Sequence, residues 1–461
     1  MEYIIAPYVI LLLILTHFII KDALSKFCLY SFIIYWGISL FITCFHPMGM
    51  GDVAPKTHML LMLAMLGFCS GFFCFNYYID NKAYTASNTE LLKNTRKYCS
   101  STFFNVFYIL STIFLLNFAV RALVLAEVNG GTIEYAEREE LVFQGNKYAQ
   151  MFMDFIITPL SFVTFTFLGI NLLKPSRKLW KFYTTAPLFT VSYLIIAGGR
   201  SIFVIGAMIV MIVMVSMKVY RSKYNISLKY ILIGIPVVLV LMLAMAAQTN
   251  YRSKGKYELD DKALKESIEA MAESFYTYSV IPVKMLDHAL EIDLPEKFGT
   301  FNLGRATFAG TDFLLCRGIG HITGHTPKST MEIVYYCQEN WVQILPKSHL
   351  GYNYCYTATF YNYLDFGFIG VFIMPFVFSF LFRFFVIKYQ QYKSLPDLLI
   401  LSFGYFMMLM SLFNGYFIKP WTLIYCIVLI IWSEYNHPIF KHYKIKKIFP
   451  WKKVTIKLFT R

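Results

Sequence analysis

The sequence predicts an all-α, polytopic membrane protein with about eleven transmembrane helices and one large outer loop that contains amphipathic helices. Two observations predict this fold. Of the 461 residues, 57% are hydrophobic and only 15% are charged, a more apolar composition than a soluble domain needs for its core. The apolar residues also come in runs of about 17 to 25, the length at which a helix crosses about 30 Å of hydrocarbon.

The predicted spans divide the chain into four parts. Residues 1–247 hold transmembrane helices 1 to 8, residues 248–367 form the large loop, residues 368–435 hold helices 9 to 11, and residues 436–461 form a basic tail. The first span follows Glu2 and has neither a basic segment nor a small-residue cleavage site, which is typical of a retained helix. The spans are predicted at residues 3–20, 28–44, 58–78, 103–126, 149–173, 179–197, 201–219, 230–247, 368–387, 398–417 and 421–433.

The distribution of charge predicts the orientation of these spans. Alternate connections together with the tail carry 25 of the 42 Lys and Arg residues and 5 of the 27 acids, which gives +20. The remaining 17 basic and 22 acidic residues leave −5 on the opposite side. By the positive-inside rule, the N-terminus and the large loop lie outside and the C-terminus lies in the cytoplasm. The excess of positive charge is therefore interpreted as facing lipid headgroups rather than nucleic acid.

The large loop is predicted to contain two helices and irregular backbone between them. Leu264, Ile268, Met271 and Phe275 recur at helical spacing among charged residues, which predicts an amphipathic helix. A second helix is predicted from Ser329 toward Trp341, with Ser329 and Glu332 at capping-box spacing. Irregular backbone is expected at the loop glycines, which are Gly299, Gly304, Gly310, Gly318, Gly320 and Gly324. Such backbone near a membrane must be covered by protein or line a wet cavity, so this loop is the expected roof of a site.

Three arginines on the outer side are candidates for binding an anionic substrate. Arg200 lies in the short turn between the sixth and seventh spans, after Gly198 and Gly199. A guanidinium on a tight turn above the hydrocarbon is suited to gripping a phosphate, although such a residue can also simply anchor a helix end at the headgroups. Arg252 and Arg121 are secondary candidates, and each alone is also explained as a loop or snorkelling arginine.

The stretch from Tyr352 to Gly370 is the most informative part of the loop. Thr357, Tyr361 and Asp365 are spaced so that they share one helical face where the loop re-enters the membrane. Polar groups among aromatic side chains are typical of surfaces that bind sugars, although aromatics at this depth also form an ordinary interface belt. Asp365 could orient an acceptor hydroxyl or take its proton, or it could cap the ninth helix.

Candidates for a general base are found among the loop histidines, since imidazole titrates near neutral pH. His325 and His349 lie beside turn-forming residues, but an ordinary hydrogen-bonded loop histidine explains each of them as well. The acidic cluster from Glu134 to Glu140 is interpreted first as a solvated helix face. The outer segments contain no DxD motif, and their cysteines lack metal-site spacing, so we expect neither a metal nor a cofactor.

Two short motifs resemble those of the bacterial O-antigen and capsule repeat-unit polymerases of the Wzy type. Asn353, Tyr356 and Thr357, followed by Tyr363 and the D-F-G-x-x-G pattern from Asp365 to Gly370, are similar to the family's re-entry motif. The turn from Gly198 to Ser201 is similar to its glycine and arginine turn.

The resemblance implies a metal-independent, polytopic C-class glycosyltransferase of the bacterial inner membrane. Such an enzyme transfers a nascent glycan from undecaprenyl diphosphate onto a lipid-linked oligosaccharide repeat unit. It implies membrane lipids and a chain-length regulator as partners, and no nucleic acid. It also implies that Arg200 and Arg252 hold the diphosphate, while Tyr356, Thr357 and Tyr361 contact the glycan.

Other functions remain open at the level of sequence. An O-antigen ligase shares the expected fold. A flippase or transporter would more naturally have short connections and a polar pathway through the bundle, which these spans do not show. A membrane acyltransferase would place a catalytic histidine in or beside an apolar helix, where only His17 and His58 qualify.

Overall fold

The computed structural model describes residues 2–46, 49–75, 88–128, 142–197, 201–218, 279–340, 342–343 and 357–437. Over these residues the fold is built from α-helices, with a π-helical turn and a 3-10 turn and no β-strand. Residues 279–291 are also helical. The other elements are α1 (Glu2–Ile19), α2 (Ala23–Thr43), α3 (Pro55–Cys74), α4 (Asn88–Cys99), α5 (Thr102–Val128), α7 (Lys147–Phe152), η3 (Met153–Ile157), α8 (Thr158–Leu173), η4 (Arg177–Leu179), α9 (Lys181–Ala197), α10 (Ser201–Lys218), α13 (Leu294–Phe298), α14 (Ala309–Thr323), α15 (Met331–Glu339), α16 (Ala358–Tyr392), α17 (Leu395–Met410) and α18 (Pro420–Asn436).

The predicted all-helical fold is confirmed for the described residues, and several of its helices are candidate membrane spans. Within the described part of the chain, five helical segments are long and apolar enough to cross a membrane. They are Ala23–Thr43, Pro55–Cys74, Thr102–Leu125, Lys147–Leu173 and Ala358–Tyr392. Shorter apolar helices lie at Tyr3–Ile19, Val204–Met217 and Leu395–Met410. The predicted span at 230–247, the predicted amphipathic helix at 264–275 and the tail after residue 437 lie outside the described residues.

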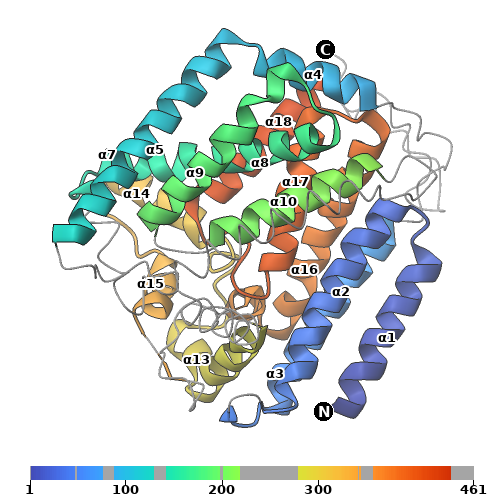
Figure 1. Cartoon of the computed structure of the whole chain (residues 1–461). Coiled ribbons are helices and arrows are strands. Elements are labelled where there is room, and N and C mark those ends of the chain that lie inside the picture. The colour runs from blue at the N-terminus through green and yellow to red at the C-terminus, as the bar shows by residue number, and fades with distance from the viewer. Residues whose placement is uncertain are drawn as a thin grey trace, which may run out of the picture.

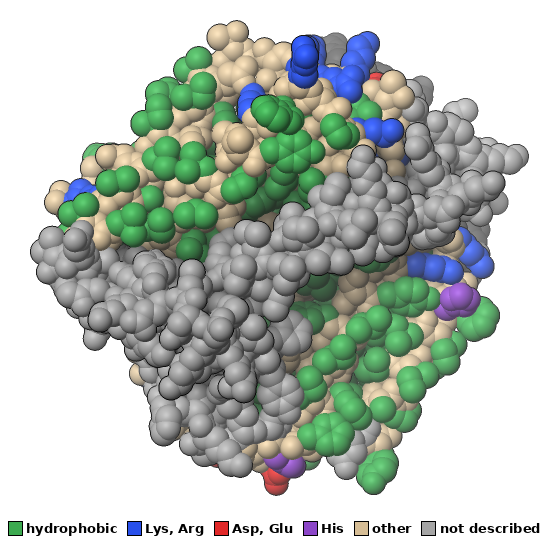
Figure 2. Space-filling view, viewed as in Figure 1, with side chains coloured by type: hydrophobic (Ala, Val, Ile, Leu, Met, Phe, Trp, Pro, Cys, Tyr) green, Lys and Arg blue, Asp and Glu red, His purple; other side chains and the backbone are tan. Residues whose placement is uncertain are grey.

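Apolar stripes on the outer surface of these helices favour a lipid environment. On α5, Val106, Ile109, Leu110 and Ile113 are each more than half exposed, and their spacing places them on one face of the helix. Figure 2 shows apolar side chains spread over the flanks of the bundle, whereas Lys and Arg gather mainly near α4 and the connection between α1 and α2. An unpaired apolar face of this extent is stable in hydrocarbon and costly in water.

The helix ends gather at two opposite ends of the bundle, which we call the α13 end and the α4 end (Figure 1). At the α13 end, the backbone N–H of Ala358 at the start of α16 donates to the carbonyl oxygen of Ser411, just after α17, at 2.8 Å. The N–H of Gly310 in α14 donates to the carbonyl oxygen of Phe417, just before α18, at 3.2 Å. The helix of residues 279–291, α13, α14 and α15 therefore cover one end of the apolar helices.

Buried ion pairs join the helices near the α4 end. Arg383 of α16 donates to the Asp22 carboxylate at the N-terminus of α2 at 2.6 Å, and only 1% of the Arg383 side chain is exposed. Lys388 donates to Glu434 of α18 at 2.6 Å. A buried charge is tolerable only when it is paired and hydrogen-bonded, and these pairs also fix the order in which α2, α16 and α18 pack.

Helices α3 and α16 approach each other closely because α3 presents two glycines four residues apart. A Cβ atom at Gly67 would lie 2.3 Å from the carbonyl oxygen of Phe372, and one at Gly71 would lie 2.1 Å from that of Phe376. Small residues at this spacing let two helix backbones pack in contact inside a membrane. Helix α3 thus packs against the part of α16 that contains Phe372 and Phe376.

The expectations for the loop are partly confirmed. Helix α15 forms near the predicted place, but its N-cap is Thr330 and makes no side-chain cap bond, so the predicted capping box does not form. Gly299, Gly304 and Gly324 have positive φ angles, as irregular backbone requires. Irregular backbone is a wrong prediction for Gly310, Gly318 and Gly320, which lie inside α14. Cys316 and Cys337 are free and buried, and Cys355 is outside the described residues.

Candidate functional site at the kink of helix α16

Helix α16 is broken at the D-F-G sequence, at the ninth and tenth of its 35 residues. Phe366 and Gly367 leave the helical region, and Gly367 adopts φ 58° and ψ −142°, a conformation that is essentially restricted to glycine. Gly370 is required for another reason, since a Cβ atom there would lie 2.2 Å from the carbonyl oxygen of Asn362. The kink therefore requires glycine at both glycine positions of the D-F-G-x-x-G motif.

The kink leaves backbone carbonyls without helical partners, and the loop uses one of them. The backbone N–H and the side-chain amide of Asn302 both donate to the carbonyl oxygen of Leu364, at 3.2 and 3.0 Å. A buried carbonyl without a partner would destabilise the fold. The break in α16 thus creates the attachment point for residues 299–307, which we call the clamped turn.

The side chain of Asp365 holds the same turn by hydrogen bonds. Its two carboxylate oxygens accept hydrogen bonds from the backbone N–H groups of Ala306 at 2.9 Å and Thr307 at 2.7 Å. The Thr307 hydroxyl in turn donates to the side-chain oxygen of Asn362 at 3.1 Å. Asp365 is fully buried, so its negative charge is stabilised by two fixed backbone dipoles rather than by water.

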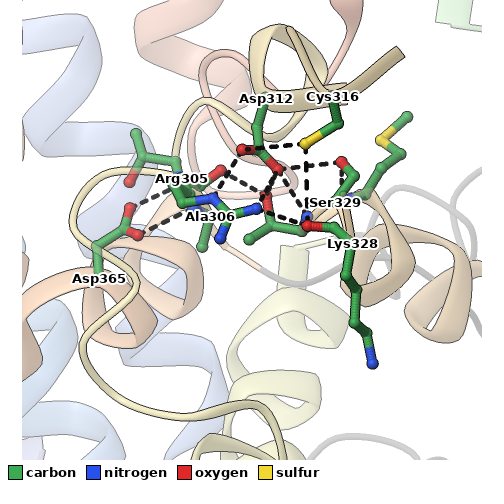
Figure 3. Close-up of polar contacts among 10 residues, drawn as sticks. Arg305, Ala306, Asp312, Cys316, Lys328, Ser329 and Asp365 are labelled. Carbon is green, nitrogen blue, oxygen red and sulfur yellow. Dashed lines mark hydrogen bonds and ion pairs between the residues drawn. The ribbon is translucent and has the colours of Figure 1, made fainter. Parts of the chain in front are cut away.

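A second carboxylate, Asp312 of α14, holds the other side of the clamped turn (Figure 3). Its oxygens accept from Arg305 Nε at 2.7 Å and Nη2 at 3.2 Å, and from the backbone N–H of Thr330 at 2.7 Å. The Ser329 hydroxyl donates to it at 3.0 Å. Burial alone would raise the pKa of Asp312, but the hydrogen bonds from Arg305, Thr330 and Ser329 outweigh it and lower that pKa.

The hydrogen bonds that hold the clamped turn leave part of Arg305 available at the surface. Its Nη2 also donates to the carbonyl oxygen of Lys328 at 2.7 Å, whereas Nη1 has no partner among the described residues. The Arg305 side chain is 47% exposed. Because Asp312 neutralises its charge, Arg305 can offer one directed hydrogen bond to a ligand, but it is not a free cation for a diphosphate.

The structure corrects the expected role of the Thr357, Tyr361 and Asp365 face. Tyr361 and Asp365 lie one turn apart in α16 and Thr357 is its N-cap, but each of the three is at most 1% exposed. The face is turned into the protein and does not form an open surface for sugars. Asp365 as a general base is a poor match to this geometry, because both oxygens are used by backbone donors. Nor does it cap the part of α16 that follows the kink, because its oxygens accept from Ala306 and Thr307 and not from a backbone N–H of α16 in the described structure.

Two of the remaining predicted site residues, His325 and Arg121, are described, and neither lies at this kink. His325 follows the C-terminal Gly324 of α14 and is exposed, and it is not among the hydrogen-bond partners of Asp365 or Arg305 in the described structure. Arg121 is half-buried on α5, which packs mainly against α9. Arg200, Arg252, His349 and Tyr356 lie outside the described residues.

Helix directions place the end of α9, at Ala197, and the start of α10, at Ser201, at the α13 end. Lys181 at the start of α9 donates to the carbonyl oxygen of Cys99 in α4 at 3.2 Å. The carbonyl oxygen of Met217 near the end of α10 accepts from Asn88 of α4 at 2.9 Å. Since these two ends lie at α4, Ala197 and Ser201 belong to the opposite end of their helices.

Sequence reasoning missed Arg305 and Asp312. The available signal was their separation of seven residues beside a glycine-rich segment, together with the paired hydroxyls of Ser329 and Thr330. Ser329 was singled out, but as a helix cap rather than as a donor to Asp312. No group of three His, Cys, Asp or Glu side chains in the described ranges could hold a metal ion.

Comparisons with protein-family models, with curated proteins and with solved structures find no match to this chain.

Proposed function

We propose that this chain is a membrane glycosyltransferase that works at its α13 end, and that it polymerises lipid-linked oligosaccharide repeat units. The observation that carries the proposal is the kink of α16. A helix that crosses the membrane is broken near its end so that two buried carboxylates can hold the clamped turn, and this turn presents polar groups beside the apolar bundle. Positioning of this kind is what a transfer between two lipid-linked substrates needs.

The orientation within the proposal rests on charge. The connections at the α4 end belong to the set with a formal net charge of +20. The large loop at the α13 end belongs to the set with a formal net charge of −5. By the positive-inside rule the α13 end faces outward, with the N-terminus outside and the C-terminus in the cytoplasm. In a bacterial inner membrane, this end meets glycans that have already been flipped across the bilayer.

The reaction assigned to the site is a displacement at the anomeric carbon of the donor. The oxygen of an acceptor hydroxyl forms the new glycosidic bond, the bond from that carbon to the undecaprenyl diphosphate oxygen breaks, and a base takes the hydroxyl proton. Negative charge on the leaving diphosphate is stabilised by fixed cations. Arg200 is assigned to this charge with Arg252, while Arg305 Nη1 offers one further hydrogen bond.

The base remains assigned to the loop histidines His325 and His349, or to the acids from Glu137 to Glu140. Asp365 is assigned a positioning role, because its hydrogen bonds hold Ala306 and Thr307. The buried side chains of Arg383 and Lys388 give no support to the transporter alternative, since they are paired with Asp22 and Glu434 close to the α4 end.

Glycan analysis of a deletion strain tests the proposal. Loss of the polymer with retention of a single repeat unit on the surface is the expected result, and it should be reversed by the full-length chain. Absence of both products would favour a ligase or a flippase. An unchanged ladder of polymer lengths would overturn the proposal.

A further inference from the structure

A cavity of about 340 Å³ lies at the α13 end, between the first turn of α3, the segment around α13 and the outer part of α16. Its size is at the lower end of the range for small-ligand sites. The residues that line it and bear on its chemistry are Lys56, Asp293, Glu296, Thr300 and Tyr363.

Hydrogen bonds fix the walls of this cavity to one another. Asn302 attaches the clamped turn to the carbonyl oxygen of Leu364, the residue after Tyr363. On the opposite wall, Asp287 accepts from the backbone N–H of Ala54 at 2.9 Å and from the Thr57 hydroxyl at 2.7 Å. The helix of residues 279–291 is thereby tied to the start of α3 on either side of Lys56. The cavity is preformed, so a ligand would not have to order its walls.

The chemistry of the lining is that of a carbohydrate site. Tyr363 supplies an aromatic ring, with the Lys56 ammonium 5.8 Å from its centroid. Asp293 and Glu296 supply carboxylates that have no side-chain partner among the described residues. Carboxylates accept hydrogen bonds from sugar hydroxyls, and an aromatic face packs against the C–H face of a sugar ring.

The charge of the lining distinguishes between classes of ligand. Two carboxylates and one ammonium leave a net charge of −1, which disfavours a diphosphate, a phosphate or a uronic acid. The cavity also lies beside the kink of α16, where the membrane helix meets the clamped turn. A neutral sugar at this place would belong to the glycan part of a substrate rather than to its lipid anchor.

We propose that this cavity binds a neutral sugar residue of the lipid-linked glycan and so positions the oligosaccharide above the membrane. The proposal rests on the proposed function for the identity of the glycan. The stacking surface is assigned to Tyr363, and the hydroxyl acceptors are assigned to Asp293 and Glu296.

Saturation-transfer NMR on the full-length chain in lipid nanodiscs tests this subsite. The probe is the oligosaccharide released by mild acid from the surface polysaccharide of the strain that encodes the chain, with a dextran oligomer as the comparison glycan. Tyr363→Ala should raise the dissociation constant about tenfold, as expected for a lost stacking contact. Tyr363→Phe keeps the ring and should bind as the wild type does.

Two further variants keep the test independent of folding. Glu296→Gln changes an exposed side chain and should weaken binding without changing thermal stability. Tyr335→Ala removes an aromatic side chain of α15 that is 43% exposed and lies outside the cavity, so it should bind normally.

Three results would overturn the subsite: no saturation transfer to the probe with the wild type, equal transfer to probe and dextran, or wild-type affinity in both Tyr363→Ala and Glu296→Gln. The glycan ladder separates this failure from failure of the proposed function. Normal polymerisation by strains with the Tyr363→Ala and Glu296→Gln chains would remove the subsite and leave the polymerase proposal intact. Probe binding together with an unchanged glycan ladder in the deletion strain would overturn the polymerase proposal and leave the sugar subsite intact.

Discussion

Asp365 and Thr307 are 58 residues apart in the sequence, yet the Thr307 backbone N–H donates to the Asp365 carboxylate at 2.7 Å. Ala306 donates to the other oxygen of the same carboxylate. The outer part of α16 and the clamped turn are therefore joined directly by the two oxygens of one buried carboxylate. This relationship gives Asp365 a role that can be separated from catalysis by experiment.

Asp365→Asn is expected to lower stability and polymer formation together. The asparagine amide group presents one oxygen and one NH₂ to two backbone donors, so either Ala306 or Thr307 loses its acceptor. An unsatisfied buried donor costs about 1–3 kcal/mol. The melting temperature of the purified protein and the glycan ladder of the complemented strain measure the two effects.

Glu332→Gln is the matched control for that substitution. Glu332 pairs with Lys328 at 3.0 Å, and its side chain is 55% exposed, so the change should cost less than about 0.5 kcal/mol. A direct catalytic role for Asp365 would instead require a fully stable Asp365→Asn protein that makes no polymer.

Gly367→Ala is expected to destabilise the kink through backbone strain alone. A Cβ atom at Gly367 would meet nothing within 4 Å, but its φ of 58° with ψ of −142° is costly for any other residue, at about 1–3 kcal/mol. Gly318→Ala in α14 also meets nothing within 4 Å, and it should be neutral or stabilising because alanine favours helix. Thermal melts of both variants check the contrast, and equal melting temperatures would mean that the kink is unstrained.

The sequence predicts the helices well because their signal is local. Apolar runs of membrane length specify α2, α3, α5 and α16 without reference to any other part of the chain. The helical spacing of Thr357, Tyr361 and Asp365 likewise follows from local periodicity. What spacing cannot give is the direction in which a shared face points, and here the face is buried.

The hydrogen bonds that hold the clamped turn could not be predicted, because they join residues that are far apart in the sequence. Asp365 bonds to Ala306, and Asp312 bonds to Arg305 and Thr330, across loop segments whose paths no local pattern specifies. The cavity beside Tyr363 also requires the start of α3, more than 300 residues earlier in the chain, to lie against the loop. The sequence pattern singles out the stretch that contains the kink, but it predicts chemistry or a helix cap for Asp365 and gives no sign of the hydrogen bonds to Ala306 and Thr307.

Arg200→Lys is expected to impair polymerisation strongly at a normal protein level. Lysine keeps the positive charge but loses the planar fork that binds two phosphate oxygens at once. The ratio of polymer to single repeat units in the glycan ladder, normalised to the amount of protein in the membrane, is the measurement. Near-normal polymer from Arg200→Ala would rule out its role at the diphosphate.

Asp312 is expected to make the clamp sensitive to acid. Its pKa is lowered from the ordinary value of 3.8, so the stabilising contribution is complete above that value and is lost as the pH falls through the folded-state pKa. The melting temperatures of the wild type and Asp312→Asn should differ by a constant amount from about pH 8 to about pH 5. The difference should shrink below about pH 4. A difference that persists undiminished to lower pH would show that the carboxylate charge does not support the turn.

Cysteine labelling at described positions tests the orientation on which the proposed function depends. Ile322 of α14 is 87% exposed at the α13 end, and Ser100 is exposed directly after α4. A membrane-impermeant maleimide added to intact spheroplasts should label Ile322→Cys and spare Ser100→Cys, because the positive-inside rule places the α4 end in the cytoplasm. Permeabilised cells should label both positions, which shows that each cysteine is reactive. The unsubstituted chain provides the background from native cysteines, and Cys74→Ser removes the one that is exposed in the described structure. Labelling of Ser100→Cys alone in intact spheroplasts would reverse the topology and remove the α13 end as a site for glycans outside the membrane.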